Sequence, residues 1–357
     1  MIFAFLALLI GVASVIYLQN SRFKTAYCFL IGAALVFISG LRSEWVGTDT
    51  HSYVEGFYSF VPGQQSIFDL SGQREFLFYL YRNIVRSLTG SYAIFLFLPA
   101  LFYIWTVCRF INRHSSSPVI SFLLFLSMGY YSFSMAGIRQ TIAIGFLILA
   151  TEFLLERKFL RCGLLILVAA GFHITSLVYL LVILLYFLPL NKWFIGMIAL
   201  LTGVTWIGGE RLVFFLVEMI WGDSRSYKQE FGGISTLLLL LVVSVATLLL
   251  YRPLWKYRDS RKAAPLPEME GDLLFTKMLL FSVPFQLMAV YQANAFRIAM
   301  LFHFPMIVLL PNVIAAQEDF RSRVFAKLFV VFCLLYQLFF ITYFTAGVLP
   351  YSFFWQS

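Results

Sequence analysis

A small set of ionisable side chains interrupts an otherwise apolar sequence. Arg139 is the only residue ionised at neutral pH in the stretch 119–151. An arginine near the interior of a membrane costs at least about 2.5–3.5 kcal/mol. We therefore expect its guanidinium to face a polar cavity or an anion.

Two further arginines suggest the chemistry of that anion. Arg42 opens RSEWVGTDTHSY, and Arg297 lies in NAFRIAM, each beside an apolar segment. Three arginines on one face would suit a diphosphate, because the guanidinium fork pairs with two phosphate oxygens at once. His173, which follows a glycine and a phenylalanine, or Asp49, within GTDT, could then act as a general base.

Each of these residues except Arg139 also has a simple structural interpretation. Arg42 could extend to the membrane interface, and Arg297 could anchor a helix there. Asp49 could form a turn or cap a helix, and His173 could be a packing residue. Arg139 has little polar company in the sequence, which favours a functional role for it.

Other chemistries lack their motifs. The sequence has no Asp-x-Asp pair for a metal-bound nucleotide and no histidine pair with zinc spacing. It also has no phosphate-binding glycine loop and no nucleophile elbow. We expect neither a metal nor a cofactor.

The composition indicates a membrane protein. Of the 357 residues, 61% are hydrophobic and only 12% are charged, whereas soluble proteins carry about 25% charged residues. Long apolar runs predict spanning helices rather than the short alternating strands of a barrel. The predicted fold is an all-α polytopic membrane protein of 11–12 spans in one integral domain, 1–357.

Hydropathy places the predicted spans. The first apolar run has no basic n-region and no cleavage site, so it is expected to be a retained helix. The short runs before and after His173 predict either one bent helix or two half-helices. The predicted spans are 1–18, 26–41, 92–108, 119–137, 140–155, 160–172, 174–189, 193–207, 234–251, 273–293, 298–315 and 326–345.

Three longer polar segments separate these spans. Segment 42–91 is predicted to be an outer-face loop after the second span. Its part 75–88 places Glu75, Arg82, Asn83 and Arg86 on one helical face, which is the pattern of a helix lying at the interface. Segment 208–233 is predicted as a second outer-face loop, and 252–272 as a basic cytoplasmic loop. The four cysteines stand singly in apolar segments and are expected to be packing residues.

The distribution of charged residues predicts which side of the membrane each loop faces. With the N-terminus outside, most of the 26 basic residues fall on cytoplasmic loops, while the acidic residues divide nearly evenly. The formal charge of +9 is therefore explained by membrane orientation and not by nucleic-acid binding. The same orientation brings Arg42, Asp49, Arg139, His173 and Arg297 to one membrane face.

Several motifs resemble those of the EpsG-type membrane proteins, relatives of the Wzy polysaccharide polymerases. The first is R-x-x-x-x-G-T-D-T-x-x-Y, which begins at Arg42 and ends at Tyr53. It is followed in the family's order by IRQTIA (138–143), GFHxTS (171–176), FRIAMLFHFPMIVLLPN (296–312) and LPYSFFW (349–355). Together they cover almost the whole chain.

The resemblance implies a GT-C-like glycosyltransferase in the bacterial inner membrane. It would join undecaprenyl-diphosphate-linked oligosaccharide repeat units, as donor and acceptor, at the outer face. Its product would be O-antigen, capsule, common antigen or exopolysaccharide. A chain-length regulator and a flippase of the same pathway, and membrane lipid, would be its partners.

The resemblance also implies residue roles. Arg139, Arg297 and Arg42 would bind the donor diphosphate, and His173 would activate the acceptor hydroxyl or contact phosphate. Asp49 would be the base or would orient an arginine. Gln140, Tyr53 and Tyr351 would line the sugar path. The alternatives are a flippase for the same glycan lipid, or another membrane transferase such as a glycan ligase or an O-acyltransferase.

Overall fold

A computed structural model describes residues 2–19, 21–70, 72–221, 232–251, 267–341 and 346–356 of the chain. Within these ranges the regular elements are helices, with two isolated β-bridges and no strand. Five helices are long and apolar enough to cross a membrane, or up to seven if each of two bent pairs is one span. The predicted all-α polytopic membrane fold is confirmed.

The long candidate spans lie where hydropathy predicts them, and other predicted spans coincide with shorter apolar helices. The candidate spans are Tyr92–His114, Ile138–Leu155, Lys192–Phe215, Gly233–Leu250 and Met269–Tyr291. The shorter apolar helices are Ile2–Val15, Lys24–Gly40, Phe159–Phe172 and Ile174–Phe187. Length and composition alone define these candidates, so the number of spans stays a prediction.

The chain forms two compact units. Unit 1 comprises Met1–Leu177 and Leu334–Ser357, and unit 2 comprises Val178–Cys333. Unit 1 therefore contains both ends of the sequence, and it holds every predicted site residue except Arg297.

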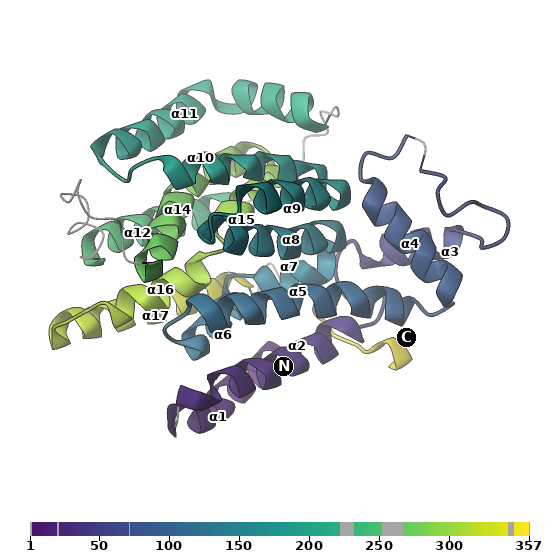
Figure 1. The fold of residues 1–357 in the computed structure, drawn as a ribbon, viewed down its shortest axis with the longest axis horizontal. Helices are drawn as coiled ribbons and strands as arrows, with labels where there is room; N and C mark the ends of the chain where they lie inside the picture. The colour runs from purple at the N-terminus through teal and green to yellow at the C-terminus, as the bar shows by residue number, and fades with distance from the viewer. Residues whose placement is uncertain are drawn as a thin grey trace. The chain divides into compact units, whose positions relative to one another are not determined.

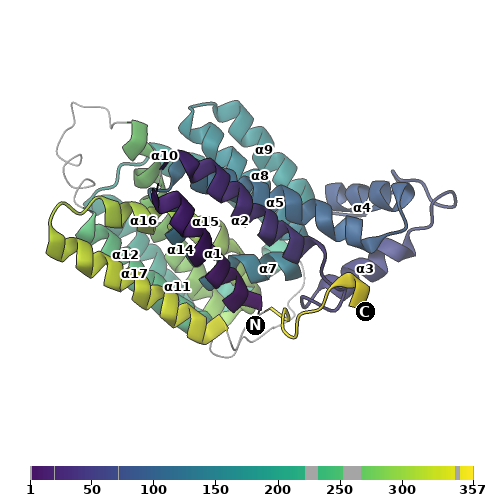
Figure 2. The same ribbon diagram turned by 90° about the horizontal axis from the view of Figure 1, so that it is seen from below.

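Unit 1 is a layered set of helices. In it α8 (Ile138–Leu155) packs against α9 (Phe159–Phe172) and α5 (Tyr92–His114), and α2 (Lys24–Gly40) packs against α5. Figure 2 shows α1 (Ile2–Gln19) running beside α2. The loop between α8 and α9 is short, so the two helices are antiparallel, and the start of α8 meets the end of α9.

Two breaks interrupt predicted spans. The predicted span 119–137 consists of α6 (Pro118–Ser127) and α7 (Tyr130–Ala136), bent by 50°. Gly129 separates them with φ 78°, a left-handed conformation that suits glycine. At the second break, α9 ends at Phe172 and His173 is extended, with φ −152° and ψ 112°. The expected interruption at His173 is therefore present.

The predicted outer-face loop contains two helices of its own. These are α3 (Thr50–Ser59) and α4 (Phe76–Leu88), which lie together at one end of the long helices of unit 1 (Figure 1). Their apolar faces join α5 and α8 in one buried cluster. Its buried members are Val54, Phe57, Phe78, Val85, Phe95, Leu96, Ile138 and Ile142. This shared core fixes α3 and α4 against the ends of the spanning helices.

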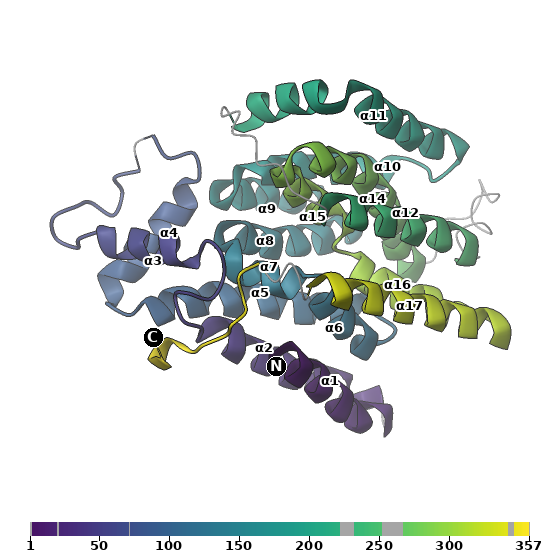
Figure 3. The same cartoon turned by 180° about the vertical axis from the view of Figure 1, so that it is seen from behind.

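The C-terminal strap, residues 346–356, holds the loop before α3. Backbone hydrogen bonds join Ser43 N to Ser352 O and Gly47 N to Gly347 O, each at 2.9 Å. An isolated antiparallel bridge pairs Arg42 with Phe353, and Figure 3 shows the strap beside this loop. The motifs at the two ends of the sequence are thus adjacent in the fold.

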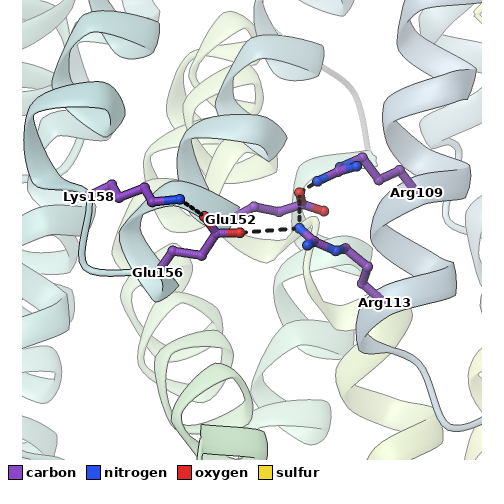
Figure 4. Close-up of polar contacts among 5 residues, drawn as sticks. All are labelled: Arg109, Arg113, Glu152, Glu156 and Lys158. Atoms are coloured by element: carbon purple, nitrogen blue, oxygen red, sulfur yellow. Dashed lines mark hydrogen bonds and ion pairs between the residues drawn. The ribbon is translucent and has the colours of Figure 1, made fainter.

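A charge cluster joins α5 to α8 at the other end of these helices (Figure 4). Glu152 is buried, and one of its oxygens accepts hydrogen bonds from Arg109 and Arg113 at 2.7 Å each. Glu156 lies 3.5 Å from Arg113 and 2.7 Å from Lys158. Because these contacts link the last turns of α5 and α8, they set the register of the two helices.

Unit 2 contains the remaining helices. Within it, α14 packs against α11, α12 and α15. The predicted second outer-face loop, 208–233, begins as helix, because α11 continues to Trp221 past a non-helical Gly209. Residues 222–231, and most of the predicted basic loop 252–272, lie outside the described residues. The elements are α10 (Leu181–Phe187), α11 (Lys192–Trp221), α12 (Gly232–Leu250), α14 (Pro267–Tyr291), α15 (Phe296–His303), α16 (Met306–Ala315) and α17 (Phe320–Ile341), which reaches into unit 1.

Candidate functional site

Arg139 forms an ion pair with a carboxylate distant in sequence. Its Nη1 lies 2.7 Å from Glu75 Oε2, and its Nη2 donates a longer hydrogen bond of 3.4 Å to Tyr79 Oη. The side chains of Arg139 and Glu75 are 31% and 12% exposed. The pair is therefore mostly shielded from water. A hydrogen bond between charged groups is stronger in such a shielded place than in water.

The same carboxylate binds His173. Glu75 Oε1 lies 2.6 Å from His173 Nδ1 and also accepts the backbone N–H of Ile174 at 3.3 Å. An ionised carboxylate only accepts hydrogen bonds, so Nδ1 carries a proton, and in the uncharged form of the ring Nε2 holds the lone pair. Nε2 is buried and has no hydrogen-bond partner among the described residues.

The environment of Glu75 keeps it ionised. Burial on its own would raise the pKa of this carboxyl group. The hydrogen bonds and charges of His173 and Arg139 outweigh burial and lower the pKa to about 2. Glu75 is consequently an anion throughout the physiological range, able to hold Arg139 and orient His173 together.

The backbone brings these three residues together from three elements. Arg139 is the second residue of α8, and His173 follows the last residue of α9, so the antiparallel packing places both at one end of the hairpin. Glu75 occupies the N-cap position of α4, which also packs on α9. Its side chain makes no capping hydrogen bond, because its two oxygens bind Arg139 and His173 instead.

Aromatic rings surround the guanidinium of Arg139. Its Cζ lies 4.9 Å from the centre of the Phe78 ring, 5.2 Å from Tyr79 and 5.4 Å from Tyr53. Such contacts attract a cation through the ring quadrupole. The predicted site residue Tyr53 is therefore next to Arg139, although its place on a sugar path stays a prediction.

Arg42 is in a different environment from the one predicted for a diphosphate ligand. The residue is 1% exposed, and its guanidinium donates to the carbonyls of Val46 at 3.3 Å, Met135 at 2.9 Å and Ser39. Burial lowers its pKa to about 10, so it remains charged at neutral pH. In this arrangement Arg42 ties the loop before α3 to the end of α7.

Gly47 and Asp49 shape the turn into α3. Gly47 has φ 103°, and a Cβ there would lie 2.5 Å from Met135 O, so only glycine fits this approach. Thr50 Oγ1 donates to the same Met135 carbonyl at 2.8 Å. Asp49 occupies the N-cap position of α3, but its side chain makes no capping hydrogen bond there.

The other predicted site residues lie elsewhere. Gln140 is 1% exposed on α8, and the Tyr351 hydroxyl donates to the Ile38 carbonyl, fixing the strap to α2. Arg297 is the second residue of α15 and belongs to unit 2. The structure thus unites Arg139, His173 and Tyr53, with Arg42, Asp49 and Tyr351 in the loop and strap.

Glu75 is the residue that sequence reasoning missed. The helical pattern grouped it with Arg82, Asn83 and Arg86 on the polar face of an interfacial helix. In the structure Glu75 precedes that helix and turns towards Arg139, while Asn83 is buried and donates to Ile67 O at 3.2 Å. The available signal was a lone carboxylate at the start of an aromatic helix in the predicted outer-face loop.

Comparisons with known proteins add one finding. A family model described as the EpsG family matches residues 3–353, nearly the whole chain. No curated protein and no solved structure matches.

Among the described residues, no group of three His, Cys, Asp or Glu side chains could hold a metal ion.

Proposed function

Since the chain belongs to the EpsG family of Wzy-like polysaccharide polymerases, we propose that the cluster of Arg139, Glu75 and His173 carries out its glycosyl transfer. The substrates would be oligosaccharide repeat units linked to undecaprenyl diphosphate, joined at the outer face of the bacterial inner membrane. The observation that carries this proposal is the double contact of Glu75, which holds a cation on one oxygen and the predicted base on the other.

His173 would act as the general base. The acceptor hydroxyl attacks the anomeric carbon of the donor sugar while Nε2 takes the hydroxyl proton, and the bond from that carbon to the diphosphate oxygen breaks. The charge of Glu75 stabilises the imidazolium that forms, as a carboxylate beside a catalytic histidine does. The buried, unpartnered Nε2 supports this role, because a buried nitrogen without a partner costs about 1–3 kcal/mol.

Arg139 would stabilise the leaving diphosphate. The bond that breaks leaves its electron pair on a phosphate oxygen, and a fixed cation offsets the charge that develops there. Arg139 is partly exposed, and its Nε has no hydrogen-bond partner among the described residues. Glu75 and the three rings would hold the guanidinium in place before the substrate arrives.

The remaining predicted residues have other roles in this proposal. Arg42 would act as a positioning residue, since its three nitrogens already bind carbonyls of the chain. Asp49 would set the start of α3 and thereby the place of Tyr53. Arg297 as a diphosphate ligand, the sugar-path roles of Gln140 and Tyr351, and the GT-C-like fold stay predictions from the sequence.

The test is complementation of cells that lack the gene. Wild-type protein should restore the ladder of surface glycan, and correctly inserted His173→Ala protein should leave single repeat units on the outer face. Arg113→Lys, at the far end of unit 1, serves as a matched control and should restore the ladder. Lipid-linked repeat units that accumulate facing the cytoplasm in the null cells would indicate a flippase and overturn the proposal.

A further inference from the structure

A second feature of unit 1 is an exposed tryptophan held flat against a histidine. Trp45 is 64% exposed, and its ring stacks on His51 with the centroids 4.1 Å apart and the planes 16° from parallel. His51 covers one face of the indole. A tryptophan with an apolar body and a polar edge is typical of interfaces, where its open face contacts a ligand, a partner or lipid.

The rim of this stack is acidic. His51 Nδ1 lies 3.0 Å from Glu44 Oε2, and its Nε2 lies 3.4 Å from Glu55 Oε1. The side chains of Glu44 and Glu55 are 25% and 68% exposed. Carboxylate oxygens that remain partly in water can accept hydrogen bonds from a ligand.

The backbone under Trp45 is fixed before any ligand binds. Ser43 N and Gly47 N, on either side of it, donate to the C-terminal strap, and Trp45 N lies 3.4 Å from Ser43 Oγ. Arg42 holds the same loop through the Val46 carbonyl. A side chain ordered in advance loses little entropy on binding, so even a small contact contributes to affinity.

The charges beside Trp45 exclude several ligand classes. Insertion of the indole into hydrocarbon would desolvate Glu44 and Glu55 at high cost. Phosphates, uronic acids and nucleic acids would be repelled by the same two carboxylates. The flat C–H face of a sugar ring fits the indole, and its hydroxyl or amino groups suit the carboxylates.

We propose that Trp45, Glu44 and Glu55 form a saccharide subsite for a neutral or amine-bearing sugar unit of the glycan substrate. This proposal rests on the proposed function. His51 and Tyr53 are two residues apart on α3 and therefore point to different sides of the helix. Tyr53 faces Arg139, so the subsite on the other side binds a sugar away from the reacting carbon.

The test uses the full chain in lipid nanodiscs, labelled with 5-fluorotryptophan and followed by fluorine NMR. The Trp45 signal is assigned by its loss in Trp45→Phe. Titration with neutral oligosaccharides and with amino-sugar oligosaccharides should shift this signal saturably, and uronic-acid oligosaccharides should not. Trp105, which is 51% exposed on α5, provides an internal control whose signal should stay in place.

Two variants sharpen the result. The double variant Glu44→Gln, Glu55→Gln should weaken saccharide binding and remove the discrimination against uronic acids. In reconstituted polymerisation, Trp45→Ala should raise KM for the glycan lipid roughly 3- to 10-fold with kcat little changed. Trp105→Ala should change neither constant.

The outcomes separate this proposal from the proposed function. An unchanged Trp45 signal with every saccharide, or equal shifts with uronic acids, overturns the subsite even if the protein polymerises. Contact of Trp45 with spin-labelled lipid tails and no response to sugar also overturns it and identifies a membrane anchor. A saturable shift in protein that fails to polymerise supports the subsite and counts against the reaction proposed for His173.

Discussion

Arg139 and Glu75 are 64 positions apart in the sequence, and their Nη1 and Oε2 atoms lie 2.7 Å apart in unit 1. This pair accounts for an arginine that the sequence shows alone in an apolar segment. The carboxylate also contacts His173, so a single anion links the predicted cation to the predicted base.

Replacement of Glu75 by glutamine should impair catalysis. The amide has no charge to stabilise an imidazolium, and it no longer fixes the proton of His173 on Nδ1. We expect the rate of polymerisation by purified protein to fall by about 100-fold. Glu156→Gln, which removes a carboxylate from the cluster at the far end of α8, should keep the wild-type rate. Equal rates for the two variants would contradict the role of Glu75.

Replacement of Arg139 by lysine should show whether catalysis needs only a positive charge at this position or also the planar guanidinium group. Lysine retains a positive charge for Glu75 but lacks the planar fork that binds two oxygens. We expect a melting temperature close to that of the wild type and a fall in kcat of about 100-fold. Arg139→Ala should lose both stability and activity, because it leaves Glu75 without its cation. Full activity of Arg139→Lys would show that this side chain has only a structural role.

The stability that Glu75 provides should depend on pH in one direction. Its pKa is lowered from 4.5 to about 2 in the folded protein, so the folded state binds this proton more weakly than the unfolded state. The contribution is therefore fully present above about pH 4.5 and is lost as the pH falls towards 2. We expect the difference in melting temperature between wild type and Glu75→Gln to shrink as the pH falls below about 4. A gap that widens below pH 4 would contradict the low pKa.

The two glycines Gly47 and Gly63 provide a matched pair. Both have positive φ, 103° and 83°, but a Cβ meets Met135 O at 2.5 Å only at Gly47, and Gly63 has open space. Gly63→Ala should lower the free energy of unfolding by about 1–2 kcal/mol from backbone strain alone. Gly47→Ala should cost more, because α3 must also move away from α7, and Tyr53 moves with it. Thermal unfolding of both variants measures the difference, and similar losses would show that the close approach is unimportant.

Several features followed from the sequence because they depend on local composition. Apolar runs of sufficient length predict spanning helices wherever they occur, which is why the helical membrane class and the positions of the long candidate spans agree with the structure. The interruption at His173 was also predictable, since hydropathy weakens there. The EpsG resemblance rested on short motifs in a fixed order, and the family match over residues 3–353 bears it out.

Partnerships of side chains depended on the tertiary structure. Glu75 looked like part of an interfacial polar face, and Arg42 like a phosphate ligand. The packing of α4 on α9 turned Glu75 towards Arg139 and His173. The approach of α7 placed a backbone carbonyl next to Arg42. Hydropathy is a property of each segment by itself, whereas the partner of a buried charge is set by whichever distant segment packs against it. The sequence alone therefore predicted that Arg139 faces a polar cavity or an anion, and only the folded chain decided that Glu75 is its partner.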